Sequence, residues 1–328
     1  MAGIEELVST LQKKFGKEIV AGNTSQEVTF ISSGSMGLDL ALGGGYPLGR
    51  IVELRGYESS GKTTLALTAC ASIQRQTGKA IIYVDRENAI DMDYVEALGV
   101  DISPDKFILT QAGTAEECLE IIRESAKSDA VGGIVMDSVA GMFSTGLSAM
   151  FPRCYLDAEV GDAKMGVLAR LMSAWLPGIV GDLKRNNIIA LFINQYREKI
   201  GVMYGSPKTT PGGKSLGFYA SQILDIAKSG VIGDKGEESA IHVKVRVEKN
   251  KVAPPLRKAE FDIRFGEGVD RASEVLELAV GYEVIEKKGT FFRYNGSLIG
   301  QGAEKARIFL RDNLELMQEI ESKITEKI

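Results

Sequence analysis

The chain has 328 residues, a formal net charge of −5 and 44% apolar residues, which is the composition of an ordinary globular protein with one large or two smaller domains. The negative charge argues against a protein that coats nucleic acid through bulk charge, although a few placed Lys and Arg can still form a basic groove. The absence of any run near about 18 apolar residues predicts no membrane span, and three dispersed cysteines without a C-x-x-C pair predict no zinc site and a cytoplasmic protein.

The N-terminal residues 3–16 predict an amphipathic helix, because Ile4, Leu7, Leu11 and Phe15 recur at helical spacing. The segment lacks the apolar core of a signal peptide. Its apolar stripe suits either a contact with the protein's own core or a contact with another subunit. A polar linker is expected over residues 22–27. Ser35 should then cap a helix that ends at Gly43.

Residues 51–64, IVELRGYESSGKTT, predict a short strand, a glycine-flanked loop and a helix from Thr63. The loop has the pattern G-x-x-x-x-G-K-[ST] of a phosphate-binding loop, formed by Gly56, Gly61, Lys62 and Thr63. The glycines let backbone N–H groups surround phosphate oxygens, and the helix directs its positive end at them. Lys62 adds a full charge on the terminal phosphates, and Thr63 offers a hydroxyl to Mg²⁺. The pattern therefore predicts binding of a nucleoside triphosphate.

Strands and helices alternate after this loop. Apolar runs predict strands at residues 80–85, 107–109, 133–137 and 188–194, and helices at residues 93–98, 115–128 and 162–187. Pro177 should break or kink the last of these helices. Continuous apolar runs without alternation are typical of a parallel sheet that is covered on both faces.

The pattern changes after Gln195. Residues 196–214 form a long glycine-rich loop, and such loops are usually functional or disordered. Order resumes at residues 218–227, and alternating residues 241–248 and 259–265 predict antiparallel strands that extend the sheet. A small C-terminal unit should contain helices 272–279, 302–314 and 316–323 and a hairpin. We divide the chain into an N-terminal segment 1–32, a core 33–268 and a C-terminal domain 269–328.

Polar residues at strand ends are the candidates for chemistry. Asp137 ends an apolar strand, where a nucleotide hydrolase holds Mg²⁺. Glu87 follows the strand 80–85 and can polarise an attacking water, although Asp85 and Asp91 are alternatives. Gln195 ends another strand, where its carboxamide can sense the γ-phosphate.

The loop 196–214 is locally basic, with Arg197, Lys199, Lys208 and Lys214 against the single acid Glu198. This charge fits contact with a polyanion, and a disordered lid is the alternative. Three further features give weaker indications of a functional site. His242 and Trp175 are expected to be packing or surface residues. Lys249 and Lys251 favour a solvated turn when considered from the sequence alone.

The residues quoted so far belong to longer motifs. The sequence resembles the bacterial-type RecA recombinases along nearly its whole length, through SGSMGLDLALGGG, GYESSGKTT, YVDRENAID, GIVMDSVA, GDAKMGVLARLMS, FINQYREKIGVMYGSPKTTPGG, EKNKVAPP and IGQG. The resemblance implies an α/β fold: a RecA-like P-loop NTPase core with a mostly parallel sheet, a short N-terminal helix and a small α+β C-terminal domain. It implies an ATP- and Mg²⁺-dependent protein that polymerises as a helical filament on single-stranded DNA and exchanges strands with double-stranded DNA.

The resemblance also implies roles for individual residues. Glu87 would activate water, Asp137 would hold Mg²⁺, and Gln195 would switch between ATP and DNA. Nucleotide contacts would come from Gly56, Glu58, Ser59, Ser60, Gly61, Lys62, Thr63, Thr64, Asp91 and Tyr94. The first DNA loop would lie near residues 157–166 and the second at 196–210, with DNA contacts from Met165, Arg170, Arg197, Lys199, Ile200, Gly201, Thr209, Thr210, Gly212 and Gly213. Phe218, Lys249 and Lys251 would lie at the subunit interface, where the two lysines would reach the neighbour's ATP. The segment 18–21 would add a strand to the neighbour's sheet.

Several positions depart from the family's usual pattern. Pro177, Gly217 and Ile223 stand where basic residues are usual, and Arg86 and Asn88 replace Ala and His. The chain ends at ITEKI without an acidic tail, so we expect a phage-encoded or divergent member with weaker DNA and subunit contacts. A RecA-fold ATPase that regulates or loads other proteins without strand exchange is the alternative. A DNA-binding protein with an inactive ATPase is a third, which the intact Lys62 and Glu87 disfavour.

Overall fold

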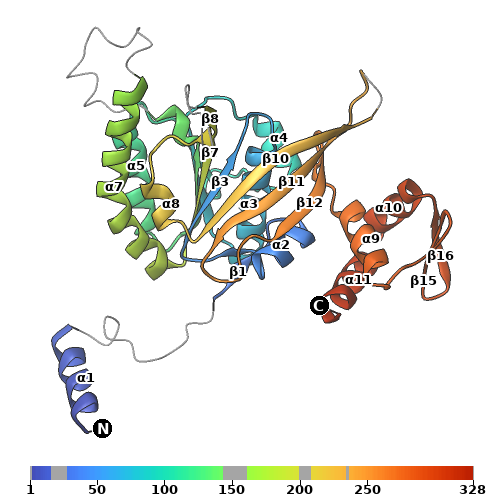
Figure 1. Cartoon of the computed structure of the whole chain (residues 1–328), viewed down its shortest axis with the longest axis horizontal. Helices are drawn as coiled ribbons and strands as arrows, with labels where there is room; N and C mark the ends of the chain where they lie inside the picture. Colours follow the sequence, from blue (N-terminus) through green and yellow to red (C-terminus); the bar gives the residue numbers. More distant parts are fainter. Residues whose placement is uncertain (1, 16–27, 143–160, 199–207, 234–235, 328) are drawn as a thin grey trace.

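A computed structural model describes residues 2–15, 28–142, 161–198, 208–233 and 236–327 (Figure 1). Its centre is a nine-stranded sheet of order β13-β12-β11-β10-β3-β7-β6-β4-β5. The strands are β3 (Ile51–Gly56), β4 (Ala80–Asp85), β5 (Phe107–Thr110), β6 (Val131–Asp137), β7 (Ile189–Gln195), β10 (Gln222–Ile232), β11 (Ala240–Asn250), β12 (Lys258–Arg264) and β13 (Gly268–Val269). Six strands from β10 to β5 run parallel, and β11, β12 and β13 add antiparallel. The predicted fold class and the antiparallel extension are confirmed.

Helices cover both faces of the sheet. Alternate residues of one strand enter different cores: Val135 belongs to the cluster that contains α3 (Lys62–Thr77) and α4 (Met92–Ala97). Its neighbour Met136 belongs to the cluster under α5 (Ala115–Ala126) and α7 (Gly161–Asn186). Because both faces are buried, the strands have continuous apolar runs.

Of the break or kink predicted at Pro177, the break is wrong, because α7 runs uninterrupted from Gly161 to Asn186, and the kink stays a prediction. A proline inside a helix costs about 3 kcal/mol through its missing N–H and its clash with the preceding turn. Met172, Leu176, Ile179 and Leu183 are fully buried on the same helix. Each such side chain contributes about 1.5–3 kcal/mol, so packing on the sheet outweighs the proline.

Two short sheets flank the core. β1 (Phe30–Ile31) pairs with β2 (Tyr46–Pro47), and β8 (Arg197–Glu198) pairs with β9 (Lys208–Thr209) inside the stretch expected to be an irregular loop. Between β1 and β2 lies α2 (Met36–Leu42), which Ser35 caps and Gly43 ends in the left-handed conformation, as predicted. The N-terminal helix α1 (Ala2–Phe15) exposes Ile4 and Leu7. The segment 18–21, expected to add a strand to a neighbour, lies outside the described residues.

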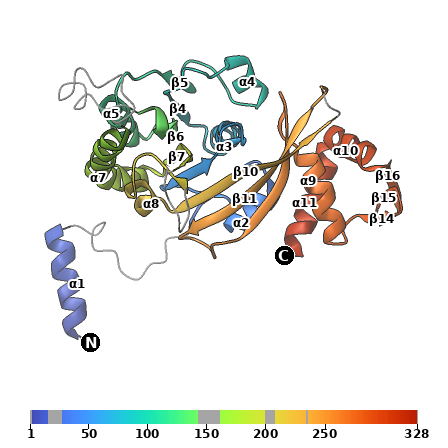
Figure 2. The ribbon, with the colours of Figure 1, turned by 45° about the horizontal axis from the view of Figure 1, so that its top comes forward.

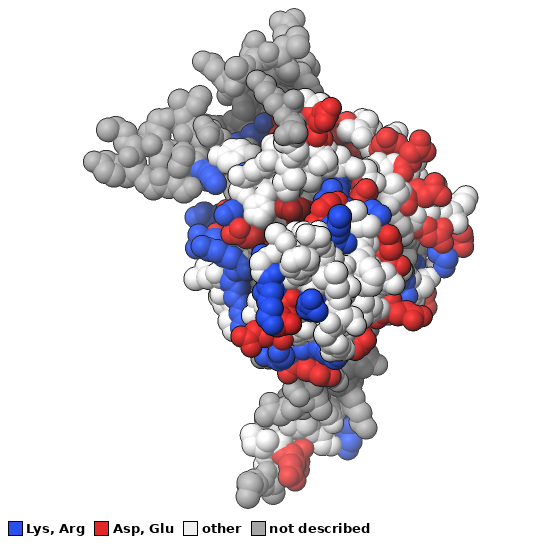
Figure 3. Space-filling view, turned by 90° about the vertical axis from the view of Figure 1, so that its right-hand side faces the viewer, with Lys and Arg blue, Asp and Glu red and all other residues white. Residues whose placement is uncertain are grey.

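The C-terminal unit has its own core. It contains α9 (Arg271–Gly281), β14 (Glu286–Lys288), β15 (Phe291–Tyr294), β16 (Ser297–Gln301), α10 (Ala303–Asp312) and α11 (Leu314–Glu326). The expected hairpin is a three-stranded sheet, because β16 pairs with β15 as well. The unit lies beside β12, and α5 and α7 lie toward the other end of the sheet (Figure 2). Seen from the side of the C-terminal unit, the surface carries basic side chains mainly on one side and acidic ones mainly on the other (Figure 3).

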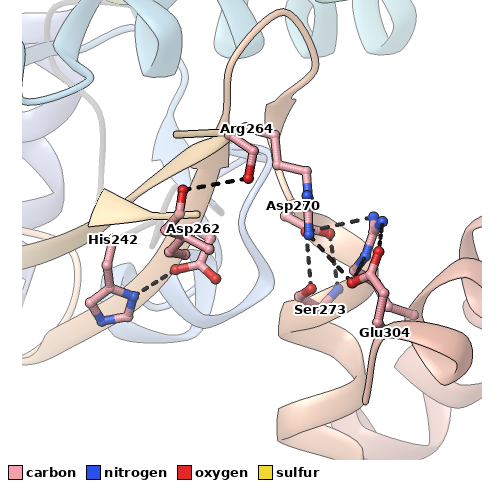
Figure 4. Close-up of polar contacts among 9 residues, drawn as sticks. His242, Asp262, Arg264, Asp270, Ser273 and Glu304 are labelled. Carbon is pink, nitrogen blue, oxygen red and sulfur yellow. Dashed lines mark hydrogen bonds and ion pairs between the residues drawn. The ribbon is translucent and has the colours of Figure 1, made fainter. Parts of the chain in front are cut away.

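Two acidic residues attach this unit to the core. Asp270 accepts a hydrogen bond from Arg264 Nε of β12, and its other oxygen caps α9 through the backbone N–H of Ser273 at 3.1 Å (Figure 4). The buried Glu274 accepts hydrogen bonds at the start of α2, from Ser35 Oγ at 2.6 Å, Met36 N at 2.8 Å and Gly37 N at 2.9 Å. The core and the unit therefore share a buried carboxylate.

Glu274→Gln should flatten the dependence of stability on pH. Burial is the largest influence on this carboxyl and raises its pKa from 4.5 to about 7, with a smaller contribution from the charge of Asp39. Between these values the folded protein holds a proton that the unfolded chain releases, so the free energy of unfolding should fall as pH rises. At 1.36 kcal/mol for each pKa unit, the fall is about 3 kcal/mol. Denaturant titrations at pH 4.5, 6 and 7.5 measure it.

The matched control is Glu326→Gln, which removes the same charge from an exposed position on α11. It should keep the pH dependence of the unchanged protein. Equal slopes in the Glu274→Gln protein and the unchanged protein would contradict the assignment to Glu274.

Candidate nucleotide and DNA site

The phosphate-binding loop connects β3 to α3 with the backbone geometry that its glycines permit. Gly61 precedes α3 at φ +89°, a left-handed conformation that side chains disfavour. A Cβ on Gly56 would lie 2.3 Å from the Ile226 carbonyl oxygen, so no larger residue fits there. Residues 59–64 line a cavity of about 260 Å³ together with Tyr94, Ile241, Ile263 and Phe265. The N-terminus of α3 opens onto this cavity and is suited to an anion.

Lys62 is almost fully buried within the loop. Its ammonium donates to the Tyr57 carbonyl oxygen at 2.6 Å and to Ser60 Oγ at 3.3 Å. Burial lowers the pKa of Lys62, and the nearby carboxylates of Asp137 and Glu87 oppose that shift. Phosphate oxygens would therefore compete with these two acceptors for the Lys62 ammonium.

Asp137 ends β6 directly opposite the start of α3. Its Oδ2 accepts hydrogen bonds from Thr63 Oγ1 at 2.9 Å and from Tyr83 Oη at 2.7 Å. Burial raises the pKa of Asp137, while these two hydrogen bonds lower it. A hydroxyl and a carboxylate at one point form the oxygen-rich donor set that Mg²⁺ prefers, so the residues present fit this ion.

Glu87 is held in an exposed turn after β4. The buried Asp85 forms this turn, because its carboxylate accepts the backbone N–H groups of Glu87 at 3.0 Å, Asn88 at 2.8 Å and Ile90 at 3.3 Å. The Asp85 carboxylate is thus already occupied by hydrogen bonds from the backbone. Among the described contacts, Glu87 Oε1 accepts from Ser138 Oγ and from Gln195 Nε2, both at 2.7 Å. The second oxygen, Oε2, is then the one that can take a proton from water.

Of the nucleotide candidates on and before α4, Tyr94 is among the residues that line this cavity and Asp91 is not. Tyr94 Oη and Thr64 Oγ1 lie 2.8 Å apart, in a hydrogen bond between α4 and α3. Asp91 caps α4 by accepting the backbone N–H of Asp93 at 3.0 Å. Tyr94 is therefore close to the phosphate-binding loop, whereas the Asp91 carboxylate is already used to cap α4.

The described DNA candidates gather where β7 leaves the sheet. Arg197 pairs with Thr209 across β8 and β9. Gly213 has φ +69°, and a Cβ there would lie 2.6 Å from Ala169 Cβ of α7, next to Arg170, so the residues after Thr210 pack closely on this helix. Lys199, Ile200, Gly201 and the side chain of Met165 lie outside the described residues, as do residues 157–160 of the expected first DNA loop.

Lys249 and Lys251, the two lysines expected at the subunit interface, lie near the amino ends of the parallel strands, whereas the phosphate-binding loop lies at their carboxyl ends. Lys249 pairs with Ile223, which is level with Glu53 near the start of β3, whereas the loop follows the end of β3. The Lys249 ammonium donates to the carbonyl oxygens of Gly217 at 2.6 Å and Phe218 at 3.1 Å. Lys251 donates to Phe218 O at 3.2 Å, and the Phe218 side chain is 69% exposed. These lysines therefore face away from the nucleotide site of their own chain.

Three residues that contact the site are absent from the sequence candidates. Ser138 binds Glu87, and Tyr83 binds Asp137. The third is Arg86, whose guanidinium donates to the Gly141 and Ala112 carbonyl oxygens and so links the Glu87 turn to the residues after β6. Tyr83 and Arg86 lie in the motif YVDRENAID and Ser138 lies in GIVMDSVA, so these motifs were the available signal, although no role was predicted for the three residues.

The phosphate-binding loop lies at the carboxyl ends of the parallel strands, and acids lie at the same ends of β4 and β6. This arrangement defines the class of P-loop nucleotide-binding proteins. Comparison with known proteins is more specific. The family models for the RecA N-terminal domain and the RecA C-terminal domain match residues 2–270 and 273–328. The chain belongs to the RecA family.

Individual relatives agree with the family models. The RecA protein of Porphyromonas gingivalis is 49% identical over 323 residues, which cover 97% of this chain and 92% of that protein. The RecA protein of Clostridium tetani is 44% identical, covering 100% and 91%. A crystal structure of the RadB recombinase has a TM-score of 0.54 at 22% identity, covering 73% of this chain and 98% of that one, which supports the fold alone.

The family determines the activity. The chain is a recombinase that carries out homologous pairing and strand exchange, and it is a DNA-dependent ATPase that binds nucleotide and DNA and forms filaments. The alternative of a loading ATPase without strand exchange is therefore set aside. Within the part of the chain that the structure describes, no helix is both long and apolar enough to cross a membrane.

Proposed function

We propose that the nucleotide is ATP with Mg²⁺, bound at the cavity between β3 and α3. Backbone N–H groups of residues 56–64 and the Lys62 ammonium would hold the phosphates. Thr63 and Asp137 would hold Mg²⁺, which supplies charge neutralisation on the phosphates when bound. Glu87 would take the proton of the attacking water, because its turn and its two hydrogen-bond donors fix its carboxylate.

We further propose that the polyanion is single-stranded DNA, with double-stranded DNA as the partner in exchange. Arg170, Arg197, Thr209, Thr210 and the glycines 212–213 would contact it, together with residues of the loop 199–207. The observation that carries this proposal is the 2.7 Å hydrogen bond from Gln195 Nε2 to Glu87 Oε1. This hydrogen bond joins Gln195, the residue before the basic loop, to the Glu87 carboxylate proposed to activate water. DNA contact at the loop could therefore affect hydrolysis through this one hydrogen bond.

The domain limits follow the same scheme. The core 33–268 would act in the cytoplasm as the ATPase, residues 1–32 would dock on the next subunit, and residues 269–328 would form the C-terminal domain. The separate C-terminal core supports this division.

Arg197→Ala should weaken the salt dependence of DNA binding. Each phosphate contact on a single strand contributes about −0.7 to the slope of log affinity against log salt, so the slope should become shallower by about that amount. Fluorescence anisotropy with a labelled oligonucleotide and an ATP analogue measures the slope. Lys305→Ala on α10 removes a like charge from an exposed position and should keep it. Equal slopes for the Arg197→Ala and unchanged proteins would place the DNA elsewhere.

A further inference from the structure

Three side chains that the mechanism above does not use meet beside the phosphate-binding loop. The rings of Tyr57 and Tyr196 have centroids 5.5 Å apart and are tilted by 58°. The Lys208 ammonium lies 5.1 Å from the Tyr57 ring and 4.9 Å from the Tyr196 ring. A cation within about 6 Å of an aromatic ring is attracted to its π-electrons, and here one cation contacts two rings.

Each member of this Tyr57–Tyr196–Lys208 cluster belongs to a different functional segment. Tyr57 follows Gly56, and its carbonyl oxygen accepts the Lys62 ammonium at 2.6 Å. Tyr196 follows Gln195, and its backbone N–H donates to the Gly56 carbonyl oxygen at 3.2 Å. Lys208 lies on β9 opposite Glu198 and next to Thr209. The cluster therefore joins the phosphate-binding loop, the Gln195 segment and β9, the strand that carries the proposed DNA contact Thr209.

The side of the cluster nearest the sheet is fixed more firmly than the side nearest solvent. Tyr196 is half-buried, and its side chain is hydrogen-bonded to Asp225 of β10; burial, the larger effect, raises the pKa of Tyr196. Tyr57 is 43% exposed and Lys208 is exposed. A displacement of β9 would thus act first on Lys208 and through it on Tyr196, which is adjacent to Gln195.

We infer that the Tyr57–Tyr196–Lys208 cluster positions Gln195 against Glu87 when DNA is contacted at β9. The inference rests on the proposed roles of Glu87 and of the DNA contacts near Thr209. Tyr57, Tyr196 and Lys208 are positioning residues, because they act on the reacting groups only through Gln195. Their loss should lower the stimulation of ATP hydrolysis by DNA rather than the binding of ATP.

Lys208→Met keeps the length of the side chain and removes its charge, and Tyr57→Leu removes a ring. Both should reduce the ratio of DNA-stimulated to DNA-free turnover about threefold or more, as expected for a partly exposed cation–π contact. Lys208→Arg and Tyr57→Phe keep the cation and the ring and should restore the ratio. The double variant Lys208→Met/Tyr57→Leu should lose less than the product of the two single effects, because the two side chains share the Lys208–Tyr57 contact.

Lys305→Met is the charge-matched control, since Lys305 is exposed on α10, outside the proposed nucleotide and DNA contacts, and it should keep the unchanged ratio. DNA affinity is measured in parallel by anisotropy across a salt series. A shallower salt slope for Lys208→Met together with an unchanged ratio for Tyr57→Leu would overturn the inference and make Lys208 a phosphate contact. Unchanged ratios in both variants would overturn it as well. A failure of the proposed function differs from both, because the unchanged protein would then show no stimulation by DNA.

Discussion

Glu87→Gln should form filaments with ATP and DNA but hydrolyse ATP about 10² to 10⁴ times more slowly than the unchanged protein, the usual contribution of a general base. The amide has the shape of the carboxylate and can still accept from Ser138 or Gln195, both 2.7 Å from the present oxygen. It cannot take a proton from water. Phosphate release measures turnover, and electron microscopy or sedimentation measures filament formation.

Two further variants separate chemistry from binding. Glu96→Gln removes a like charge from an exposed position on α4 and should hydrolyse ATP normally. Lys62→Ala should lose nucleotide binding as well as turnover, because the ammonium proposed to meet the phosphates is gone. Normal turnover in the Glu87→Gln protein would mean that another group positions the water.

Lys249→Ala/Lys251→Ala should lose DNA-stimulated hydrolysis while keeping a folded nucleotide site. The sheet register places both lysines near the amino ends of the parallel strands, away from the phosphate-binding loop of the same chain. They could then reach phosphates only on a neighbouring subunit, in the manner of an arginine finger supplied in trans, which contributes about 10³ to 10⁵ in rate. Turnover and equilibrium nucleotide binding are measured on the same preparation.

Mixing provides the decisive control for the lysine pair. The Glu87→Gln protein and the lysine double variant are each inactive, but together they should regain activity wherever an intact Glu87 meets an intact lysine pair. The control mixture of Glu87→Gln with Lys62→Ala/Lys249→Ala/Lys251→Ala should stay inactive, because no interface then has every group. Full DNA-stimulated turnover from protein shown to be monomeric by sedimentation would mean that one chain holds the whole site.

Local pattern predicted most of the sheet. The strand expected at residues 80–85 is β4, and Ser35 and Gly43 delimit α2 as expected, because strand burial and helix caps depend on residues close in sequence. The error at Pro177 arose where packing between distant segments decided the outcome. The strand β16 was missed because it pairs in a short exposed sheet with little apolar alternation.

For the site, too, the sequence predicted the features formed by contiguous residues and missed the contacts between residues far apart in the chain. The pattern of residues 56–63 identifies the loop itself, since its chemistry is contiguous. The partners of the acids were not predictable, because the hydrogen bond from Tyr83 to Asp137 joins residues 54 apart and that from Ser138 to Glu87 joins residues 51 apart. Strand position alone left Asp85 and Asp91 as alternatives to Glu87, and only the resemblance favoured Glu87. In the structure, three backbone N–H groups occupy the Asp85 carboxylate.

The phosphate-binding loop lies at the carboxyl ends of the parallel strands and the lysine pair lies near their amino ends. This arrangement has a geometric consequence for assembly. A contact that brings one edge of a subunit to the other edge of the next is head-to-tail, and such contacts either close into rings or continue as open chains. If the lysine pair acts on the neighbour's nucleotide as proposed, an open chain has two unlike ends: one terminal subunit would have a nucleotide site without a lysine pair, and the other a lysine pair without a nucleotide site. Turnover per subunit should therefore rise with chain length and level off, and growth at the two ends should proceed at different rates.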